Sequence, residues 1–173
     1  DSPHLSADRL EYTLSNMLNY HIAPIESVRL WFESLIVGKN EEGEEELMFP
    51  NLEIAEPFSM AALQTSQIYV ADEDRYAMQT LAELLKKHIQ RDVLSVADLH
   101  KTESEVIAML NRDEEAQRDW EKFRALRHIY RGHHAGAKTV HSKKRYINPY
   151  VQGMGRVKEL SASYAVALDE FMP

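Results

Sequence analysis

The stretch SADRLEYTL, residues 6–14, decides how the fold and the chemistry of this chain are interpreted. Leu10 and Leu14 are followed by further apolar residues at the spacing of one face of an α-helix. Serine is a favoured N-cap, and aspartate is favoured in the first turn of a helix. The stretch therefore predicts an amphipathic helix that begins at Ser6 or Asp8 and packs through its leucine face.

Helical patterns recur along most of the chain, so the sequence predicts an all-α fold in a single domain of residues 1–173. The further helices are expected at about residues 24–37, 51–70, 72–90, 102–111, from 113 onward, and 161–171. The expected buried stripe of the second helix comprises Val28, Trp31, Phe32 and Leu35, and that of the fourth comprises Met78, Leu81, Ala82, Leu85 and Ile89.

Two segments break the helical pattern. Residues 38–49, GKNEEGEEELMF, combine turn-forming residues with acidic ones, which predicts a short hairpin with an acidic tip. In residues 128–158, aromatic and β-branched residues alternate with basic ones and are punctuated by glycine and proline. This second pattern predicts a small antiparallel β appendage near residues 128–158.

Composition excludes several classes of protein. The chain has no cysteine, so a disulfide framework, a thiolate metal site and a cysteine nucleophile are all impossible, and a cytoplasmic location is expected. No apolar run approaches the roughly 20 residues that span a bilayer, so no membrane partner is expected. The net charge of −8 argues against nonspecific binding of nucleic acid by the whole surface.

The charge is unevenly distributed along the chain. Residues 122–158 contain ten lysines and arginines and no acid, so the rest of the chain carries −18. Lys143, Lys144 and Arg145 form the densest group, which could bind a phosphate-containing small molecule or a nucleotide. The alternative is that the basic segment balances the acidic remainder, within the chain or across an oligomer interface, and the sequence does not decide between them.

Four polar side chains gather at the start of the first helix. Asp8, Glu11 and Tyr12 lie at i, i+3 and i+4, so they approach one patch of the surface, with Arg9 beside them. A carboxylate in such a patch can ligate a hard cation. The alternative is that Asp8 stabilises the helix dipole next to an exposed arginine.

The sequence HLSADRLEYTL, residues 4–14, resembles the closing motif of the HD superfamily of metal-dependent phosphohydrolases. The likeness is greatest to the deoxynucleoside triphosphate triphosphohydrolase-like branch, where an Asp-Arg-x-Asp-Tyr run opens a helix. Asp8, Arg9 and Tyr12 match that run, and Glu11 replaces the second aspartate. The stretches FPNLEIAEPF, DEDRYAMQTLAELLKK, TESEVIAML and SKKRYINPYV also resemble the C-terminal part of members of this superfamily.

The resemblance implies an HD-domain-like helical bundle and assigns roles at its motif. Asp8 would be the last aspartate of a divalent metal site, and the metal would activate water for attack on phosphorus. Tyr12 and Glu11 would face the substrate. Arg9 would pair with a neighbouring acid or reach a phosphate.

The chain departs from the family pattern because it contains no His-Asp dipeptide, so three expected metal ligands are missing. The chain is therefore expected to be the C-terminal part of an HD-type domain whose upstream helices are absent, and not to retain the metal by itself. The family motif continues with Arg-Asp, where this chain has Ser15 and Asn16, which puts triphosphate specificity in doubt. His128, His133, His134 and His141 are not expected to build a substitute site, since adjacent histidines on a strand point to opposite faces.

Two functions of different classes follow from these patterns. The first is a metal-dependent phosphohydrolase acting on a phosphate ester or nucleotide, with Asp8 as one metal ligand. The second is a non-catalytic helical module, derived from an HD scaffold, that forms a homo-oligomer or senses a nucleotide.

Overall fold

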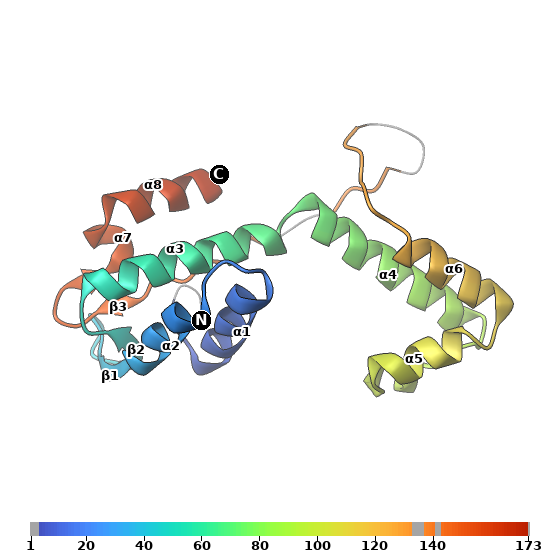
Figure 1. Ribbon diagram of the computed structural model, residues 1–173, viewed down its shortest axis with the longest axis horizontal. Coiled ribbons are helices and arrows are strands. Elements are labelled where there is room, and N and C mark those ends of the chain that lie inside the picture. Colours follow the sequence, from blue (N-terminus) through green and yellow to red (C-terminus); the bar gives the residue numbers. More distant parts are fainter. Residues whose placement is uncertain (1–3, 133–136, 141–142, 173) are drawn as a thin grey trace. The chain divides into compact units, whose positions relative to one another are not determined.

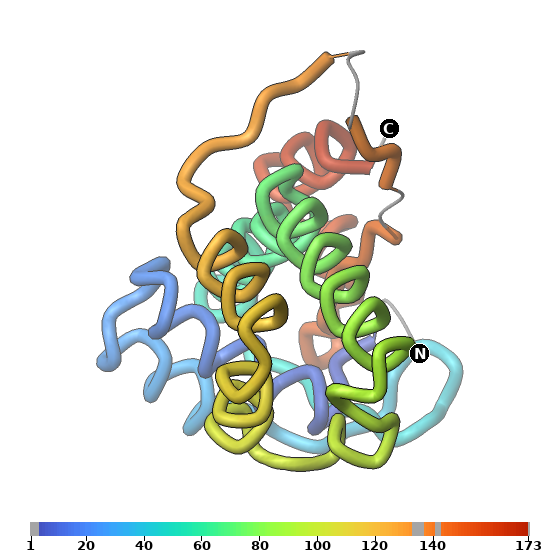
Figure 2. The backbone as a smooth tube through the Cα atoms, turned by 90° about the vertical axis from the view of Figure 1, so that its right-hand side faces the viewer, coloured from blue at the N-terminus to red at the C-terminus, as the bar shows by residue number. Residues whose placement is uncertain are grey.

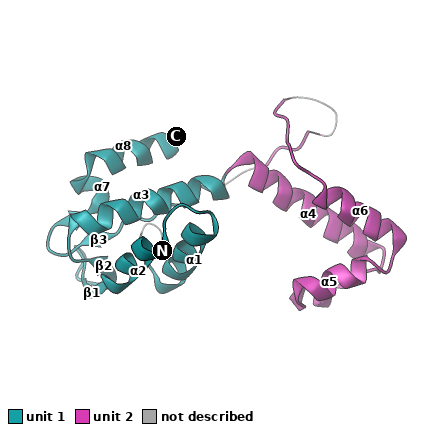
Figure 3. Ribbon diagram, in the orientation of Figure 1, with its two compact units in different colours: residues 1–70, 143–173 teal, residues 71–142 magenta. Residues whose placement is uncertain are grey.

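A computed structural model describes residues 4–132, 137–140 and 143–172 of the chain. Its contacts divide the chain into two compact units, and Figure 3 colours them separately. Unit 1 combines Asp1–Val70 with Lys143–Pro173, and unit 2 is Ala71–Ser142. The first boundary, between Val70 and Ala71, falls in the short turn between the long helices of residues 52–69 and 72–90, where no glycine-rich or proline-rich linker marks it in the sequence. That both units are the C-terminal part of an HD-type domain stays a prediction.

The described residues are mostly helical, as the helical patterns predict, but they also include a small four-stranded mixed sheet. In unit 1, α3 (Leu52–Tyr69) is the central element. Figure 1 shows α1 (Ala7–Asn19) and α2 (Ile25–Glu33) along one side of it, with α7 (Val157–Leu160) and α8 (Ala162–Phe171) along the other. None of the helices in the described ranges is long and apolar enough to cross a membrane.

The core of unit 1 forms where these helices meet the sheet. Trp31, Phe49 and Phe58 pack as an aromatic group, with ring centroids 5.9 Å apart for Trp31 and Phe58 and 5.0 Å apart for Phe49 and Phe58. Tyr164 of α8 is fully buried, and its hydroxyl donates a hydrogen bond to the carbonyl of Ile147 at 2.5 Å. This bond ties the C-terminal helix to the chain that re-enters unit 1 after residue 142.

The sheet joins two segments that are far apart in the sequence. Strands β1 (Ile36–Lys39) and β2 (Glu45–Phe49) form the expected acidic-tipped hairpin. Its turn is fixed by Asn40, whose side-chain oxygen accepts from the backbone N–H groups of Glu42 and Glu44, and by Gly43 at a φ of 79°. Strand β2 then pairs in parallel with β3 (Tyr150–Val151), which pairs antiparallel with β4 (Gly155–Arg156).

The predicted β appendage near residues 128–158 is therefore partly wrong. Among its described residues only the last part forms strands, and these complete a mixed sheet with the early hairpin. The described residues 128–132 and 137–140 have no regular secondary structure. Alternation leads to a strand only where a neighbouring strand offers backbone partners, and in this segment β2 pairs with residues 150–151, which in turn pair with residues 155–156.

Unit 2 is a helical unit with its own small core. Its elements are α4 (Asp72–Gln90), the 3₁₀ turn η1 (Val96–His100), α5 (Glu103–Leu110) and α6 (Glu114–Arg124). Figure 2 shows α4 and α6 running side by side, and the two helices are in contact. The core of the unit comprises Leu84, Leu94, Leu110 and Ala116.

The predicted helix starts are confirmed, and two predicted buried faces need correction. In α2 Val28 and Trp31 are buried as expected, whereas Phe32 is 59% exposed. In α4 the buried residues are Leu84 and His88, whereas Met78 is 57% exposed. Each of these two buried residues comes one position before a member of the expected stripe, Leu85 or Ile89. Since successive residues of a helix are about 100° apart, the buried face of α4 is rotated from the expected one.

Candidate functional site

The first turn of α1 presents the residues that the sequence singles out. Ser6 is the N-cap, and its hydroxyl accepts from the backbone N–H of Arg9 at 3.4 Å. Leu10, Leu14 and Met17 are buried and hold the helix against the unit 1 core. The polar face of the helix therefore turns toward solvent.

Asp8 is exposed on this face, at the second position of the helix. Its carboxylate forms no hydrogen bond or ion pair with another described residue. Glu11 is also exposed and accepts a hydrogen bond from the hydroxyl of Ser15 at 3.4 Å, while Tyr12 is half-buried. The three side chains share one side of the helix, as their spacing predicts.

Arg9 connects this helix to a distant part of the sequence. Its Nη1 donates to the backbone carbonyl of Tyr146 at 3.5 Å, a contact between residues 137 positions apart. Lys144, two residues before Tyr146, places its ammonium 5.6 Å from the ring centroid of Phe171 in α8. The start of α1 and the chain around residues 144–146 thus lie side by side in unit 1.

Asn16 continues the polar face one turn beyond Tyr12. Its amide donates to the hydroxyl of Tyr69 at 2.6 Å, and the Tyr69 ring stands edge-on to Tyr20 at 6.5 Å. Asn16, which stands where the motif that residues 4–14 resemble continues with aspartate, therefore contacts the end of α3.

A divalent cation needs more ligands than this patch offers. No group of three or more His, Asp or Glu side chains with metal-binding geometry exists among the described residues. Asp8 supplies a hard oxygen ligand of the kind that Mg²⁺ or Mn²⁺ prefers, but one carboxylate holds such ions weakly. His133, His134 and His141 lie outside the described residues, so the prediction about a histidine site stays a prediction.

The cations of the basic segment are divided between the two units. Five of its ten cations belong to unit 2, and the other five, including Lys143, Lys144 and Arg145, belong to unit 1. Within the described ranges, ion pairs with acids of the same unit are seen for four of the ten. These pairs are Arg131–Asp72, Lys138–Glu83, Arg156–Glu46 with Glu41, and Lys158–Asp169. For these four, charge balance within the chain is the observed role.

Arg156 belongs to the basic segment in the sequence, but the structure buries it. It is only 5% exposed, and it makes a bidentate pair with the buried Glu46, at 2.7 Å for Nη1 to Oε1 and 2.8 Å for Nη2 to Oε2. Its Nε and Nη2 also donate to Glu41, at 2.7 and 2.9 Å. Glu46 further accepts from Asn40 at 3.0 Å.

This network of Arg156, Glu46, Glu41 and Asn40 joins β4 to the β1–β2 hairpin. Burial acts to raise the pKa of Glu46, but the hydrogen bonds from Arg156 and Asn40 outweigh it, so the pKa lies below its usual value of 4.5. His4 lies 3.2 Å from the same carboxylate. No spacing signal reveals the network, since Glu46 and Arg156 are 110 residues apart.

Unit 2 contains a second buried polar group. His88 is completely buried; its Nε2 lies 3.1 Å from Asp119 Oδ2 and its Nδ1 lies 3.1 Å from Arg91 Nη1. A guanidinium only donates, so Nδ1 must accept and Nε2 must carry the hydrogen bonded to Asp119. The hydrogen bond from Lys87 holds the pKa of Asp119 below its usual value. This arrangement orients the histidine as a structural link between α4 and α6.

Comparison with known proteins adds a partial match. A segment of 111 residues, 63% of this chain, is 32% identical to the uncharacterized protein YdhJ of Bacillus subtilis (strain 168). The match covers 32% of that protein, so the chain spans about a third of the length of this relative. No protein-family model matches the chain, and no solved structure matches it.

Proposed function

We propose that unit 1 belongs to a metal-dependent phosphohydrolase of the HD type that acts on a phosphate ester or nucleotide, with Asp8 as one ligand of a divalent metal ion. The resemblance of residues 4–14 to the family motif supplies the chemistry. The observation that carries the proposal is the Arg9–Tyr146 contact, which joins the motif helix to the chain that carries Lys144 and Arg145.

The contact matters because a phosphohydrolase site needs two kinds of group. One kind holds the metal that activates the water, and the other holds the negative charge of the phosphate. Asp8 offers an exposed carboxylate without a partner among the described residues. Lys143 and Arg145 are exposed on the segment beside it, and Lys144 lies between them. The Arg9 side chain then serves to position this segment, while Tyr12 and Glu11 border the substrate.

The remaining metal ligands have to come from outside the described residues. In the proposed reaction the bound metal supplies a nucleophilic water at neutral pH. The groups of this chain orient the phosphate and balance its charge. We expect the 173-residue chain alone to bind a divalent metal weakly, because such ions need several preorganised ligands.

The test replaces Asp8 by Asn in the longest product of the same gene. The variant keeps the size of the side chain but loses its charge, so metal content and hydrolysis should fall at least tenfold while the free energy of unfolding changes by less than about 1 kcal/mol. Metal content is measured by elemental analysis, and hydrolysis is measured on a generic phosphodiester and on nucleotides.

Glu26→Gln is the matched control, because it also removes one exposed carboxylate from the first turn of a helix in unit 1. It should retain full metal content and activity. If Asp8→Asn also retains both, Asp8 is not a metal ligand.

An observation on α2 favours a second function, that of a non-catalytic homo-oligomerising module. Ile25 and Phe32, at i and i+7 on this helix, are 49% and 59% exposed, and Val37 of the neighbouring edge strand β1 is 67% exposed. Exposed apolar patches often mark protein interfaces. If the same gene product binds no metal, hydrolyses none of the substrates and elutes as an oligomer, this second function replaces the first.

A further inference from the structure

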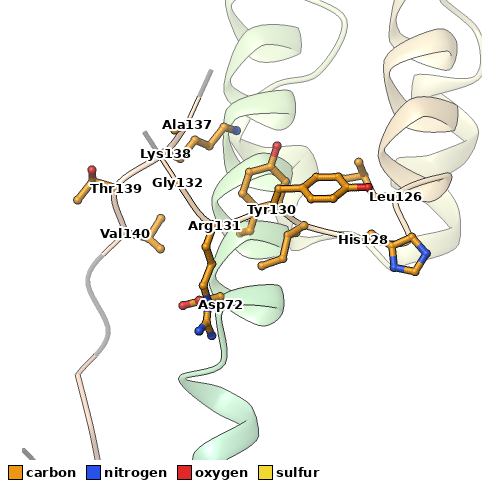
Figure 4. A pocket seen from close by; sticks show the side chains of 12 residues that line it. Asp72, Leu126, His128, Tyr130, Arg131, Gly132, Ala137, Lys138, Thr139 and Val140 are labelled. Carbon is orange, nitrogen blue, oxygen red and sulfur yellow. Dashed lines mark hydrogen bonds and ion pairs between the residues drawn. The ribbon is translucent and has the colours of Figure 1, made fainter. Parts of the chain in front are cut away.

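Unit 2 contains a pocket of about 440 Å³ that the proposed phosphohydrolase site does not use. It lies between the start of α4, the chain that follows α6 and the returning residues 137–140 (Figure 4). Small-molecule sites in proteins span roughly 300–1,000 Å³ and are lined by apolar and aromatic groups with a few polar ones. The size of this pocket therefore suits one small molecule.

Apolar and aromatic residues share the walls with five polar or charged ones. Tyr130 is 83% exposed although it lines the pocket, so a flat ligand resting on its ring would remove apolar surface from water. An aromatic ligand that lies offset from the Tyr130 ring, or edge-on to it, would also be stabilised by the electrostatic attraction between the two rings. The apolar and aromatic lining consists of Tyr76, Leu126, Ile129, Tyr130 and Val140.

The two cations of the pocket have different roles. The Lys138 ammonium is committed to Glu83 at 2.5 Å and Thr80 at 3.2 Å, and it lies 5.2 Å from the ring centroid of Tyr76. Lys138 therefore holds residues 137–140 against α4. Arg131 extends to Asp72, as Figure 4 shows, and donates to that carboxylate through Nε.

Arg131 retains donors for a ligand. Its two Nη groups make no hydrogen bond to another residue in the part of the chain that the structure describes. A guanidinium edge binds planar or tetrahedral anions through two parallel hydrogen bonds. Asp72 lies next to that edge and repels further negative charge, so the pocket suits an anion with a single charge.

We propose that this pocket binds a planar aromatic molecule with one anionic group, its ring against Tyr130 and Tyr76 and its anion on Arg131. An aromatic carboxylate and a cyclic mononucleotide share this chemistry. Polyphosphates are disfavoured by Asp72. Free phosphate lacks the ring.

Calorimetric titration of the 173-residue chain tests the proposal with both sources. Indole-3-acetate represents the aromatic carboxylates, and 3′,5′-cyclic AMP represents the cyclic nucleotides; their uncharged counterparts are indole-3-acetamide and adenosine. At least one monoanion should bind saturably at millimolar concentration or below, and more tightly than its uncharged counterpart, ATP or inorganic phosphate. The preferred monoanion identifies the source.

Arg131→Gln should weaken binding of that monoanion about tenfold, the usual effect of losing a charge-assisted hydrogen bond. Arg127→Gln is the matched control, because Arg127 is an exposed arginine of the same segment whose Nη1 donates to the carbonyls of Arg124 and Leu126, and it does not line the pocket. It should bind as the unmodified chain does. Circular dichroism of both variants establishes that they are folded.

Asp72→Asn provides an independent readout. Removing the carboxylate beside Arg131 should improve binding of ATP relative to the monoanion, which loss of structure would not do. The proposal is overturned if neither monoanion binds, if the uncharged counterparts bind equally well, or if folded Arg131→Gln keeps the original affinity.

Discussion

Arg156 illustrates how burial changes the meaning of a charged residue. In the sequence it belongs to a basic run, but in the structure both of its acidic partners come from the β1–β2 hairpin. Removing one member of a buried pair leaves the other charge without compensation. The pair therefore matters more for the fold of unit 1 than for binding an anion.

Replacing Glu46 by Gln should lower the free energy of unfolding by about 3 kcal/mol, because the Arg156 charge stays buried without its principal carboxylate. Urea denaturation followed by circular dichroism measures the change. Glu42→Gln, in the same hairpin but exposed and without an ion pair to a described residue, should change it by less than about 0.5 kcal/mol. Equal effects of the two substitutions would contradict this role of the pair.

The same pair predicts a dependence of stability on pH. The pKa values of Glu46 and Glu41 are lowered in the folded state, so unfolded glutamates bind protons first as the pH falls. The stabilisation is complete above the usual pKa of 4.5 and is lost as the pH falls through the lower folded values. Repeating the urea series from pH 7 to pH 3 should show this loss in the unmodified chain and a weaker one in Glu46→Gln.

At the level of elements, α1 and the chain around Lys144 form one surface feature although the sequence separates them. The buried leucine face fixes the orientation of α1, and the Arg9 contact fixes the neighbouring segment. In the proposed function, the cations of that segment would bind the phosphate of a substrate at the α1 surface.

Replacing Lys143, Lys144 and Arg145 together by Ala should reduce nucleotide affinity about tenfold or more at low salt, since each lost charge-assisted contact to phosphate weakens binding. The matched triple, Lys122, Arg124 and Arg127 to Ala, removes the same charge from unit 2 and should leave this affinity unchanged. Fluorescence anisotropy with labelled nucleotides across a salt series measures both. An unchanged affinity in the first triple would reject the basic segment as a phosphate site.

The whole molecule is divided into two units, and each unit has its own core. The second cluster and the caps of η1, α5 and α6 lie entirely within residues 71–142. The His88 link between α4 and α6 lies within the same range. The core and the helix caps of unit 2 are therefore formed by its own residues.

A fragment of residues 71–142 should accordingly be helical and unfold cooperatively by itself, as monitored by circular dichroism. Leu110→Ala in the fragment should lower the free energy of unfolding by about 3 kcal/mol, because Leu110 is 1% exposed. Leu99→Ala, at a leucine that is 45% exposed, should have a much smaller effect. A fragment without helical signal would show that unit 2 depends on the rest of the chain.

The local features were predictable from the sequence because they depend on residues a few positions apart. Ser6 caps α1 as expected. The other helix starts also rest on local caps, with Asp113 capping α6, Ser161 capping α8, and Thr102 and Glu105 forming a capping box at α5. The acidic hairpin follows from its turn residues. The grouping of Asp8, Glu11 and Tyr12 on one side of α1 follows from helical periodicity alone.

The sequence by itself thus determined the mostly helical character, the helix starts and the polar patch of α1. Only the tertiary structure decided that β2 pairs with β3, that Arg156 and His88 are buried, and that Arg9 meets Tyr146. It also decided the pocket of unit 2. The physical reason is range: caps and periodicity act within one or two helical turns, whereas strand pairing, burial and pockets depend on which distant segments the folded chain brings together.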